Sequence, residues 1–377
     1  MAGELGIVEL SRDRAGLRRF LHVPYDAYRN DPRWVAPLLS DRRAVLGPAN
    51  PFFAHARMAL WVATRNGRDV GSVAGIVDEH HNARHHETTA FFGFFESVDD
   101  PAVSRFLLDA VRAWAARQGM TRLLGPMNPS INEECGLLVE GFDSPPVIMM
   151  TYNPAYYAEL LGQAGLRRCK DLLAYGVTLD DRHLARLERL GARALRRAGG
   201  VTVRRVDKRA VARDLAKIQE VYNAAWADNW GHVPMTPAEI EFMAHRLLPL
   251  LDERIVYLAE GRGETVGFIL GLPDFNEALG RLRGRLVSPR LGFVLPYLVG
   301  WKVPRFTRVV AMGVKREYRQ RGIDAALMGT CLRAMLVAGY KRCEISWVLD
   351  DNPLMQSIGE MFSGAPYKRY ALYEGAV

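Results

Sequence analysis

The order of predicted strands and helices in the first half of the chain recurs in the second half. In each half, two strands joined by a turn precede a third strand, an amphipathic helix, a fourth strand, a short helix and a closing strand. The turns are Arg65-Asn66-Gly67-Arg68 and Gly261-Arg262-Gly263-Glu264, and the first has the composition of a hairpin connection. A chain of 377 residues also exceeds the usual size of one domain. The repetition therefore predicts two tandem α/β lobes.

A segment of different composition separates the two halves. Residues 180–200 are rich in Arg and Leu and end at Gly199-Gly200, which indicates a connecting helix with a glycine stop. We therefore expect an N-terminal lobe at 1–178, a connecting helix at 179–200 and a C-terminal lobe at 201–377. Hydrophobic residues make up 49% of the chain, which is enough for cores to form.

The formal net charge of +8 favours polyanionic partners. Nucleic acid, anionic lipid and coenzyme A all fit this charge. The basic residues do not form a continuous block, and the sequence contains neither a helix-turn-helix pattern nor a basic–aromatic array. We therefore expect no nucleic-acid partner, and the other two polyanions stay open.

The cysteines and the apolar segments bear on the cellular compartment. The four cysteines have neither metal-ligand nor redox spacing, so we expect no metal and a reducing environment. The first residues lack the apolar run of a secretory signal. The longest apolar stretch, Leu291–Trp301, is shorter than the roughly 20 residues that span a bilayer. These features predict a cytoplasmic protein, with peripheral contact with the inner membrane as a further option.

The second half contains a strand, a basic glycine turn and an amphipathic helix in direct succession. The strand covers Arg308–Val314, the turn is Arg319-Gln320-Arg321-Gly322, and the helix covers Ile323–Ala338. A helix N-terminus has unpaired backbone N–H groups and partial positive charge, and a phosphate group satisfies both. Glycine allows close approach, and arginines add charge-assisted hydrogen bonds. The succession predicts a pyrophosphate site, although an ordinary strand–turn–helix with surface arginines has the same pattern.

This stretch resembles the coenzyme A-binding motif of the GNAT superfamily of N-acyltransferases. Arg319 and Gly322 match two fixed positions of the motif, whereas Asp324 stands where Gly or Ala is usual. A carboxylate repels a pyrophosphate, so we expect Asp324 to point away and cap the helix. The resemblance implies that acyl-coenzyme A is the cosubstrate. The residues that it implies in binding are Met312, Gly313, Val314, Arg319, Gln320, Arg321, Gly322, Ile323, Asp324, Ala325 and Asn352. Asn352 is equally suited to cap a helix that begins at Pro353.

Further segments across nearly the full length resemble a group of bacterial tandem GNAT proteins that includes the bacterial ceramide synthases. They are Val23-Pro24-Tyr25, Asp31-Pro32-Arg33-Trp34-Val35, Asn50-Pro51-Phe52-Phe53, Phe91-Phe92-Gly93-Phe94-Phe95-Glu96 and Ser130-Ile131-Asn132-Glu133-Glu134. The resemblance implies two tandem GNAT-like lobes, each a mixed, mostly antiparallel sheet flanked by helices. It also implies transfer of a long acyl chain from acyl-coenzyme A to a primary amine such as a sphingoid base. An N-acetyltransferase of a small molecule or peptide, and a non-catalytic acyl-coenzyme A-binding regulator, remain alternatives.

The chain departs from the superfamily pattern at two places. The first lobe has an acidic segment, Glu96-Ser97-Val98-Asp99-Asp100, where the second has its basic turn, so we expect it not to bind coenzyme A. Many members carry a tyrosine that acts as general acid in the helix after the last core strand. The corresponding position here is near Gly359. We therefore assign no tyrosine as the acid.

Two segments carry candidate catalytic residues. A polar loop of the first lobe contains Asn132, Glu133 and Glu134, and adjacent carboxylates with amides suit amine recognition and proton acceptance. A solvated loop with Asx turns has the same composition. His232 follows a helix of the second lobe, where the superfamily often builds its acceptor site, and it is a candidate base. A histidine in a surface turn is the alternative.

A long insertion in the second lobe combines arginines with the apolar stretch Leu291–Trp301. Such a segment suits contact with an anionic lipid surface or a cover over a long acyl chain. A buried helix that completes the core is the alternative.

Overall fold

The computed structural model describes residues 4–285, 291, 292, 294–299 and 301–377. By packing, these residues form two units. Unit 1 contains the described residues of 1–172 and 282–288 together with 368–377, and unit 2 contains those of 173–281 and 289–367. The last strand of the chain therefore belongs to unit 1. The lobe boundaries expected at 178 and 201 follow sequence order rather than packing, and they stay a prediction.

The sheet of unit 1 has the strand order β1-β2-β3-β4-β5-β15, with β8 beside β15 off this path. Strands β4 and β5 are parallel, and the other neighbouring pairs are antiparallel. The strands are β1 (Leu5–Leu10), β2 (Ala56–Arg65), β3 (Arg68–Asp78), β4 (Thr89–Ser97), β5 (Arg122–Gly125), β8 (Leu137–Glu140) and β15 (Lys368–Ala376). A separate ladder joins β6 (Met127–Asn128) to β7 (Glu134–Cys135).

The predicted amphipathic helix of the first lobe is α5 (Pro101–Arg117). Asp100 caps it by accepting the Ala102 N–H at 2.8 Å, and Pro101 occupies the first helical position, where its missing N–H costs no hydrogen bond. The buried face of α5 packs on the sheet core. The other helices are α1 (Arg14–Phe20), α2 (Val23–Ala27), α3 (Leu39–Leu46), α4 (Glu79–His85) and α6 (Tyr157–Gln163), with a 3₁₀ turn η1 (Pro51–Ala54).

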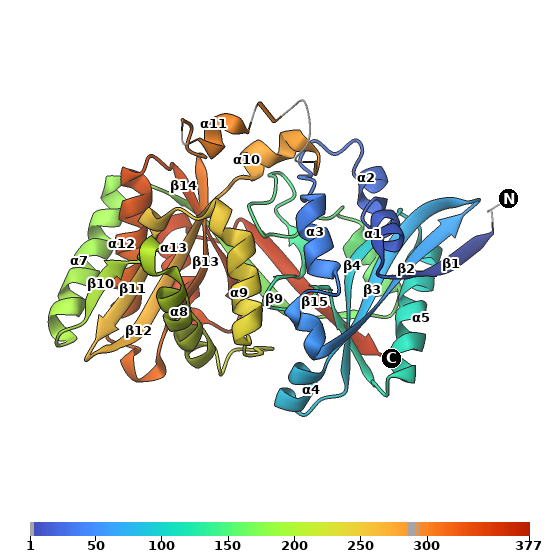
Figure 1. The fold of residues 1–377 in the computed structure, drawn as a ribbon, viewed down its shortest axis with the longest axis horizontal. Helices are drawn as coiled ribbons and strands as arrows, with labels where there is room; N and C mark the ends of the chain where they lie inside the picture. The colour runs from blue at the N-terminus through green and yellow to red at the C-terminus, as the bar shows by residue number, and fades with distance from the viewer. Residues whose placement is uncertain (1–3, 286–290, 293, 300) are drawn as a thin grey trace. The chain divides into compact units, whose positions relative to one another are not determined.

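The sheet of unit 2 has the strand order β14-β13-β12-β11-β10, with β13 and β14 parallel and the other pairs antiparallel (Figure 1). The strands are β10 (Thr202–Arg205), β11 (Val256–Gly261), β12 (Glu264–Pro273), β13 (Phe306–Val314) and β14 (Arg342–Leu349), and β9 (Arg167–Thr178) leads from one unit to the other. The order β11-β12-β13-α12-β14 repeats the order β2-β3-β4-α5-β5 of unit 1.

Helices cover both faces of the unit 2 sheet. Along β11, Tyr257 and Ala259 join a core with residues of α7, α12 and α13, whereas Leu258 faces α8 and α9. The helices are α7 (Asp181–Arg197), α8 (Val211–Ala225), α9 (Pro237–Leu247), α10 (Asn276–Leu279), α11 (Leu295–Leu298), α12 (Ile323–Val337) and α13 (Pro353–Ser363). The expected α/β class, with mostly antiparallel sheets flanked by helices, is confirmed. Within the described part of the chain, no helix has both the length and the apolar character needed to cross a membrane.

Candidate functional site

The parallel strands β13 and β14 part from one another in unit 2. They pair from Phe306 with Arg342 to Val309 with Ile345, and β13 then continues to Val314 paired with β12. At the parting point, a bulge interrupts the ladder between β13 and β12. The Lys315 N–H bonds to the Val266 carbonyl of β12 at 2.9 Å. Because backbone groups alternate along an antiparallel ladder, Met312 and Val314 direct theirs away from β12.

Side chains from elsewhere in unit 2 satisfy the outward carbonyls of this edge. The Trp226 indole Nε1–H donates to the Met312 carbonyl at 3.3 Å, and Arg319 Nε donates to the Val314 carbonyl at 3.2 Å. Gly313 lies between them, and a Cβ there would be 3.0 Å from the Ala225 Cβ. The edge therefore presents the amide N–H groups of Met312 and Val314 as donors.

The N-terminus of α12 follows this edge directly. Gln320 and Gly322 have left-handed φ angles of 60° and 74°, and Gly322 is the N-cap. The expectation that Asp324 caps the helix is wrong, because Gly322 provides no side-chain cap bond and Asp324 lies in the first turn. A Cβ at Gly322 would be 2.6 Å from the Ala194 Cβ of α7. Glycine is thus required both by its φ angle and by the contact with α7.

The two arginines of the basic turn have different environments. Arg319 binds backbone carbonyls of Val314 and Ala225, so it joins the turn to the end of α8. Arg321 is exposed, and its guanidinium lies 5.2 Å from the centre of the Tyr318 ring. The Tyr318 hydroxyl donates to Glu264 at 2.9 Å. Arg321 is therefore the arginine of the turn that is placed to meet an anion from solvent.

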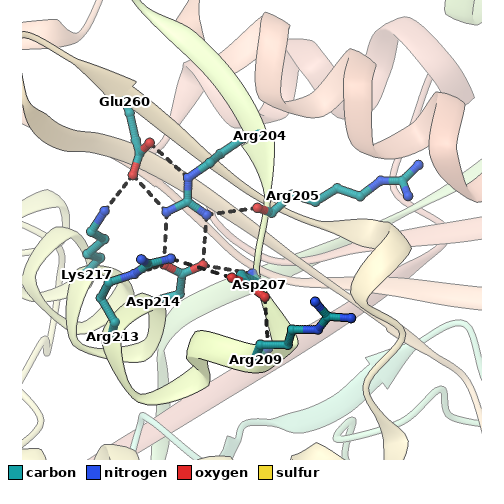
Figure 2. Close-up of polar contacts among 8 residues, drawn as sticks. All are labelled: Arg204, Arg205, Asp207, Arg209, Arg213, Asp214, Lys217 and Glu260. Atoms are coloured by element: carbon teal, nitrogen blue, oxygen red, sulfur yellow. Dashed lines mark hydrogen bonds and ion pairs between the residues drawn. The ribbon is translucent and has the colours of Figure 1, made fainter.

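An ion-pair network holds α8 against the strands β10 and β11 (Figure 2). Arg204 binds Asp214 of α8 at 2.8 Å and Glu260 of β11 at 2.8 Å, and Lys217 of α8 binds the same glutamate at 2.6 Å. The hydrogen bonds from Arg204 lower the pKa of Asp214 and lower that of Glu260 to about 2. The network fixes the helix whose C-cap is Trp226.

His232 lies beside this part of the site. It is 3% exposed, and its ring centre is 5.6 Å from that of Tyr222 and 6.4 Å from that of Trp226. The alternative of a surface turn histidine is therefore wrong. Trp226 also binds the Met312 carbonyl, so the same indole ring contacts His232 and the β13 edge.

The other catalytic candidates lie in unit 1. Asn132 and Glu133 form a turn in which their backbone N–H groups bind Ser130. Glu134 belongs to β7, and its carboxylate accepts a hydrogen bond from Arg42 at 2.6 Å. The Glu134 carboxylate is therefore engaged in an ion pair with α3, and its role as a proton acceptor stays a prediction.

The edge of unit 1 that corresponds to the donor edge of unit 2 is filled by the chain itself. Strands β4 and β5 pair in parallel from Thr89 to Phe91 and then part. A Cβ at Gly93 would lie 1.6 Å from the Met127 carbonyl oxygen, and the Asn128 side chain accepts the Phe94 N–H at 2.6 Å. Strand β6 thus occupies the space beside the β4 edge, and a ligand bound to this edge of unit 1 would overlap it.

Two positions near α13 have clear local roles. Asn352 accepts the Met355 N–H at 3.2 Å, so its predicted capping role is confirmed. A Cβ at Gly359 would lie 2.3 Å from the Tyr175 ring. Tyr175 of β9 therefore fills the space where a larger residue at position 359 would point.

Sequence patterns missed the place of Trp226 at the β13 edge and the buried environment of the Glu96 carboxyl group. Tyr222 and Trp226 stand one helical turn apart, a signal that they share a face, but the bond to a distant carbonyl has no sequence signature. Glu96 is partly accessible, and burial of its carboxyl group raises its pKa to about 7. The sequence identified it only as one acidic residue among several.

The chain is similar over nearly its whole length to two curated proteins. It is 36% identical over 372 residues to the bacterial ceramide synthase of Caulobacter vibrioides, covering 96% of this chain and 95% of that protein. It is 33% identical over 378 residues to protein YghO of Escherichia coli, covering 98% and 95%. No protein-family model matches the chain.

Solved structures with the same fold are more distant in sequence. A tandem GNAT protein from the clavulanic acid biosynthesis pathway is 14% identical with a TM-score of 0.57, and the likeness covers 99% of this chain and 98% of that one. A GCN5-related N-acetyltransferase from Sphaerobacter thermophilus is 13% identical with a TM-score of 0.51, covering 98% and 95%. These likenesses confirm the tandem GNAT fold.

Proposed function

The chain belongs to the family of the bacterial ceramide synthase and protein YghO, with a tandem GNAT fold, and on that premise we propose that it transfers an acyl group from acyl-coenzyme A to a primary amine. The observation that carries the proposal is the arrangement in unit 2 of the β13 edge and the N-terminus of α12. The edge offers amide donors for a pantetheine arm, and the helix start offers N–H groups and partial positive charge for a pyrophosphate. Both groups belong to coenzyme A.

Proposed chemistry at this edge is direct aminolysis of the thioester. The amine nitrogen attacks the carbonyl carbon, and one outward N–H group of the edge, that of Met312, stabilises the oxyanion that forms, while that of Val314 binds the pantetheine arm. His232 takes the proton that the nitrogen loses, and the thiolate leaves as the amide carbonyl reforms. A thiolate is a good leaving group, so the step requires no strong protein acid.

We propose a lipid amine as the acceptor, because the curated relative at 36% identity is named for making ceramide. The insertion of unit 2 supports this choice. Leu295 and Val299 are each 50% exposed, and Trp301 is 84% exposed. Lys302 and Arg305 are exposed nearby in sequence. Apolar and basic side chains in one exposed segment suit peripheral contact with an anionic membrane, where such an amine resides.

The direct test uses purified full-length protein with a long-chain primary amine and either palmitoyl- or acetyl-coenzyme A. We expect amide, measured by mass spectrometry, and free thiol, measured with a chromogenic disulfide, in equal amounts and faster with the palmitoyl donor. A faster reaction with the acetyl donor would move the function to a short-chain N-acetyltransferase. Absence of amide with both donors would contradict the proposal.

Two variants test the assigned roles. Arg321→Glu should weaken acyl-coenzyme A binding by about tenfold because it reverses a charge beside the pyrophosphate. The matched control is Arg68→Glu, an exposed arginine at the start of β3 in unit 1. His232→Gln should lower kcat and leave acyl-coenzyme A affinity unchanged. An unchanged kcat would remove His232 from the mechanism.

A further inference from the structure

Unit 2 contains a groove away from the strand edge at which we propose the reaction. It has a volume of about 420 Å³ and is lined by residues of α7, α12, β10 and β11 together with Arg254. In the sheet of unit 2, β10 and β11 stand at one end of the strand order, and β13 and β14 stand at the other. Ligand pockets commonly have volumes of about 300–1,000 Å³. The groove is therefore large enough for a small molecule, and the residues that we assign to acyl-coenzyme A do not line it.

Small and apolar side chains form the walls of the groove. A Cβ at Gly191 of α7 would be 2.7 Å from the Ala326 Cα of α12, so the two helices touch there, and both residues line the groove. Ala192 and Leu195 of α7 and Val337 of α12 also line it. Val337 is 79% exposed, although valine ordinarily favours burial. An alkyl chain in the groove would cover these side chains and remove their surface from water, which favours binding.

Three arginines line the same groove, and two of them are paired with carboxylates. Arg254 binds Asp252 at 2.7 Å. Arg333 binds Glu188 at 2.7 Å. Arg205 of β10 differs from both, because no carboxylate in the described part of the chain lies within ion-pair distance of its guanidinium. The groove therefore has one arginine whose charge is open to an anionic ligand.

A tyrosine hydroxyl lies beside this arginine. Arg205 and Tyr257 are direct partners across the β10–β11 ladder, so their side chains point to the same face of the sheet. Figure 2 shows the Arg205 side chain extending away from the network that Arg204 forms with α8. Its Nε donates to the Tyr257 hydroxyl at 3.3 Å. Tyr257 is 6% exposed, and no acceptor for its own hydroxyl proton lies among the residues that the structure describes. An anion at this point accepts hydrogen bonds from both side chains.

We infer that the groove binds the anion of a long-chain fatty acid, with the carboxylate at Arg205 and Tyr257 and the alkyl chain along α7 and α12. A carboxylate carries one negative charge and so matches one open arginine, whereas a phosphate monoester carries about two at neutral pH. The apolar walls match the alkyl chain. The ligand would join α7, α12 and β10, so its binding stabilises the folded protein by mass action. This site is independent of acyl transfer.

The experiment measures binding of decanoate to the purified full-length protein by titration calorimetry at neutral pH, below the micelle concentration of the ligand. Decanol is the uncharged control, and inorganic phosphate is the anion without a chain. We expect decanoate to bind and to raise the unfolding temperature, and each control to bind at least about tenfold more weakly. Decanol or phosphate binding as tightly as decanoate would overturn the inference, because the site would then read only the chain or only the charge.

Two variants alter the two halves of the groove separately. Arg205→Gln removes the charge of the head-group site and should weaken decanoate binding by about tenfold. Ala192→Leu places a larger side chain in the groove and should weaken it by about fivefold or more. The matched control is Arg209→Gln, an exposed arginine of the same unit that does not line the groove, and it should change nothing. Thermal unfolding without ligand reports whether each variant folds. Equal affinity of the unaltered protein and Arg205→Gln would overturn the site.

Competition separates the groove from the proposed donor site. We expect the affinity for decanoate to be the same in the absence and in the presence of saturating coenzyme A. Exclusion of decanoate by coenzyme A would overturn the inference and place the alkyl chain in the donor site. Decanoate binding that depends on Arg205, in a protein that forms no amide from any acyl donor, would keep the groove and refute the proposed function. The two failures are therefore distinguishable.

Discussion

Asp324 is a carboxylate at a position where the proposed ligand, a pyrophosphate, is also negatively charged. It lies in the first turn of α12, where a negative charge stabilises the helix through the dipole by about 0.3–1 kcal/mol. The same position adjoins the proposed pyrophosphate, where a negative charge repels. We therefore expect the Asp324 carboxylate to increase the stability of the fold and to lower the affinity for acyl-coenzyme A.

Replacing this carboxylate should separate the two effects. We expect Asp324→Asn to bind acyl-coenzyme A roughly fivefold more tightly, because about 1 kcal/mol of repulsion is removed, and to unfold at a slightly lower temperature. Titration calorimetry and thermal unfolding measure the two quantities. A less stable variant with unchanged affinity would place the pyrophosphate away from the start of α12.

The sequence predicted the position of the basic turn between β13 and α12 better than it predicted the contacts of the side chains in that turn. Binding of phosphate by Arg319 stays a prediction, and its guanidinium also binds the carbonyls of Val314 and Ala225, which the sequence did not predict. Local sequence determines that a basic residue follows the strand. Whether its guanidinium meets a ligand or a carbonyl depends on where α8 ends, and that is a tertiary property.

Among the elements, α8 is held in place by charged groups at one end and carries an aromatic pair at the other. The Arg204 network binds the helix to β10 and β11, while Tyr222 and Trp226 pack beside His232. Displacement of α8 therefore moves Trp226 relative to the Met312 carbonyl. The network stabilises the fold and keeps the donor edge in position.

The contribution of the network should depend on pH with a definite sign. The pKa of Glu260 falls from 4.5 to about 2 because Arg204 and Lys217 bind its carboxylate, so its stabilisation is complete above about pH 4.5 and is lost as the pH falls toward 2. Glu260→Gln should cost about 1–2 kcal/mol at pH 6 and less at pH 3 in urea unfolding. The control Asp228→Asn removes an exposed carboxylate 3.8 Å from Arg316 and should have little effect at either pH. A pH-independent difference would contradict this account.

Three apolar side chains of the unit 2 insertion, those of Leu295, Val299 and Trp301, are exposed, and we expect this segment to bind membranes. Trp301→Ser should reduce partitioning onto anionic vesicles by about tenfold, since a large apolar side chain no longer enters the interface. Co-sedimentation with vesicles of anionic or neutral lipid measures this. The control is Val337→Ser at the end of α12, which is 79% exposed and outside the segment. Equal losses in both variants would indicate non-specific adsorption.

Over the whole molecule, sequence patterns were sufficient for the repeated architecture and insufficient for the division of roles. Periodicity predicted α5 and α12, and the Arg-x-x-Gly turn precedes α12 as expected, whereas binding of the acyl donor by this half stays a prediction. The return of β15 to unit 1 could not be predicted, because strand partners far apart in the chain are chosen by packing. The same holds for the hydrogen bond from Tyr157 of α6 to Glu96 of β4, two residues far apart in the chain.

The two units should therefore bind acyl-coenzyme A unequally despite their common topology. In unit 1 the Met127 carbonyl oxygen and the Asn128 side chain occupy the strand edge, whereas in unit 2 the N–H groups of Met312 and Val314 remain directed outward. Titration calorimetry with palmitoyl-coenzyme A below its micelle concentration should give one site per chain, and Arg321→Glu should weaken that site. Two equivalent sites, or one site that is indifferent to Arg321→Glu, would show that unit 1 opens its edge and binds the donor.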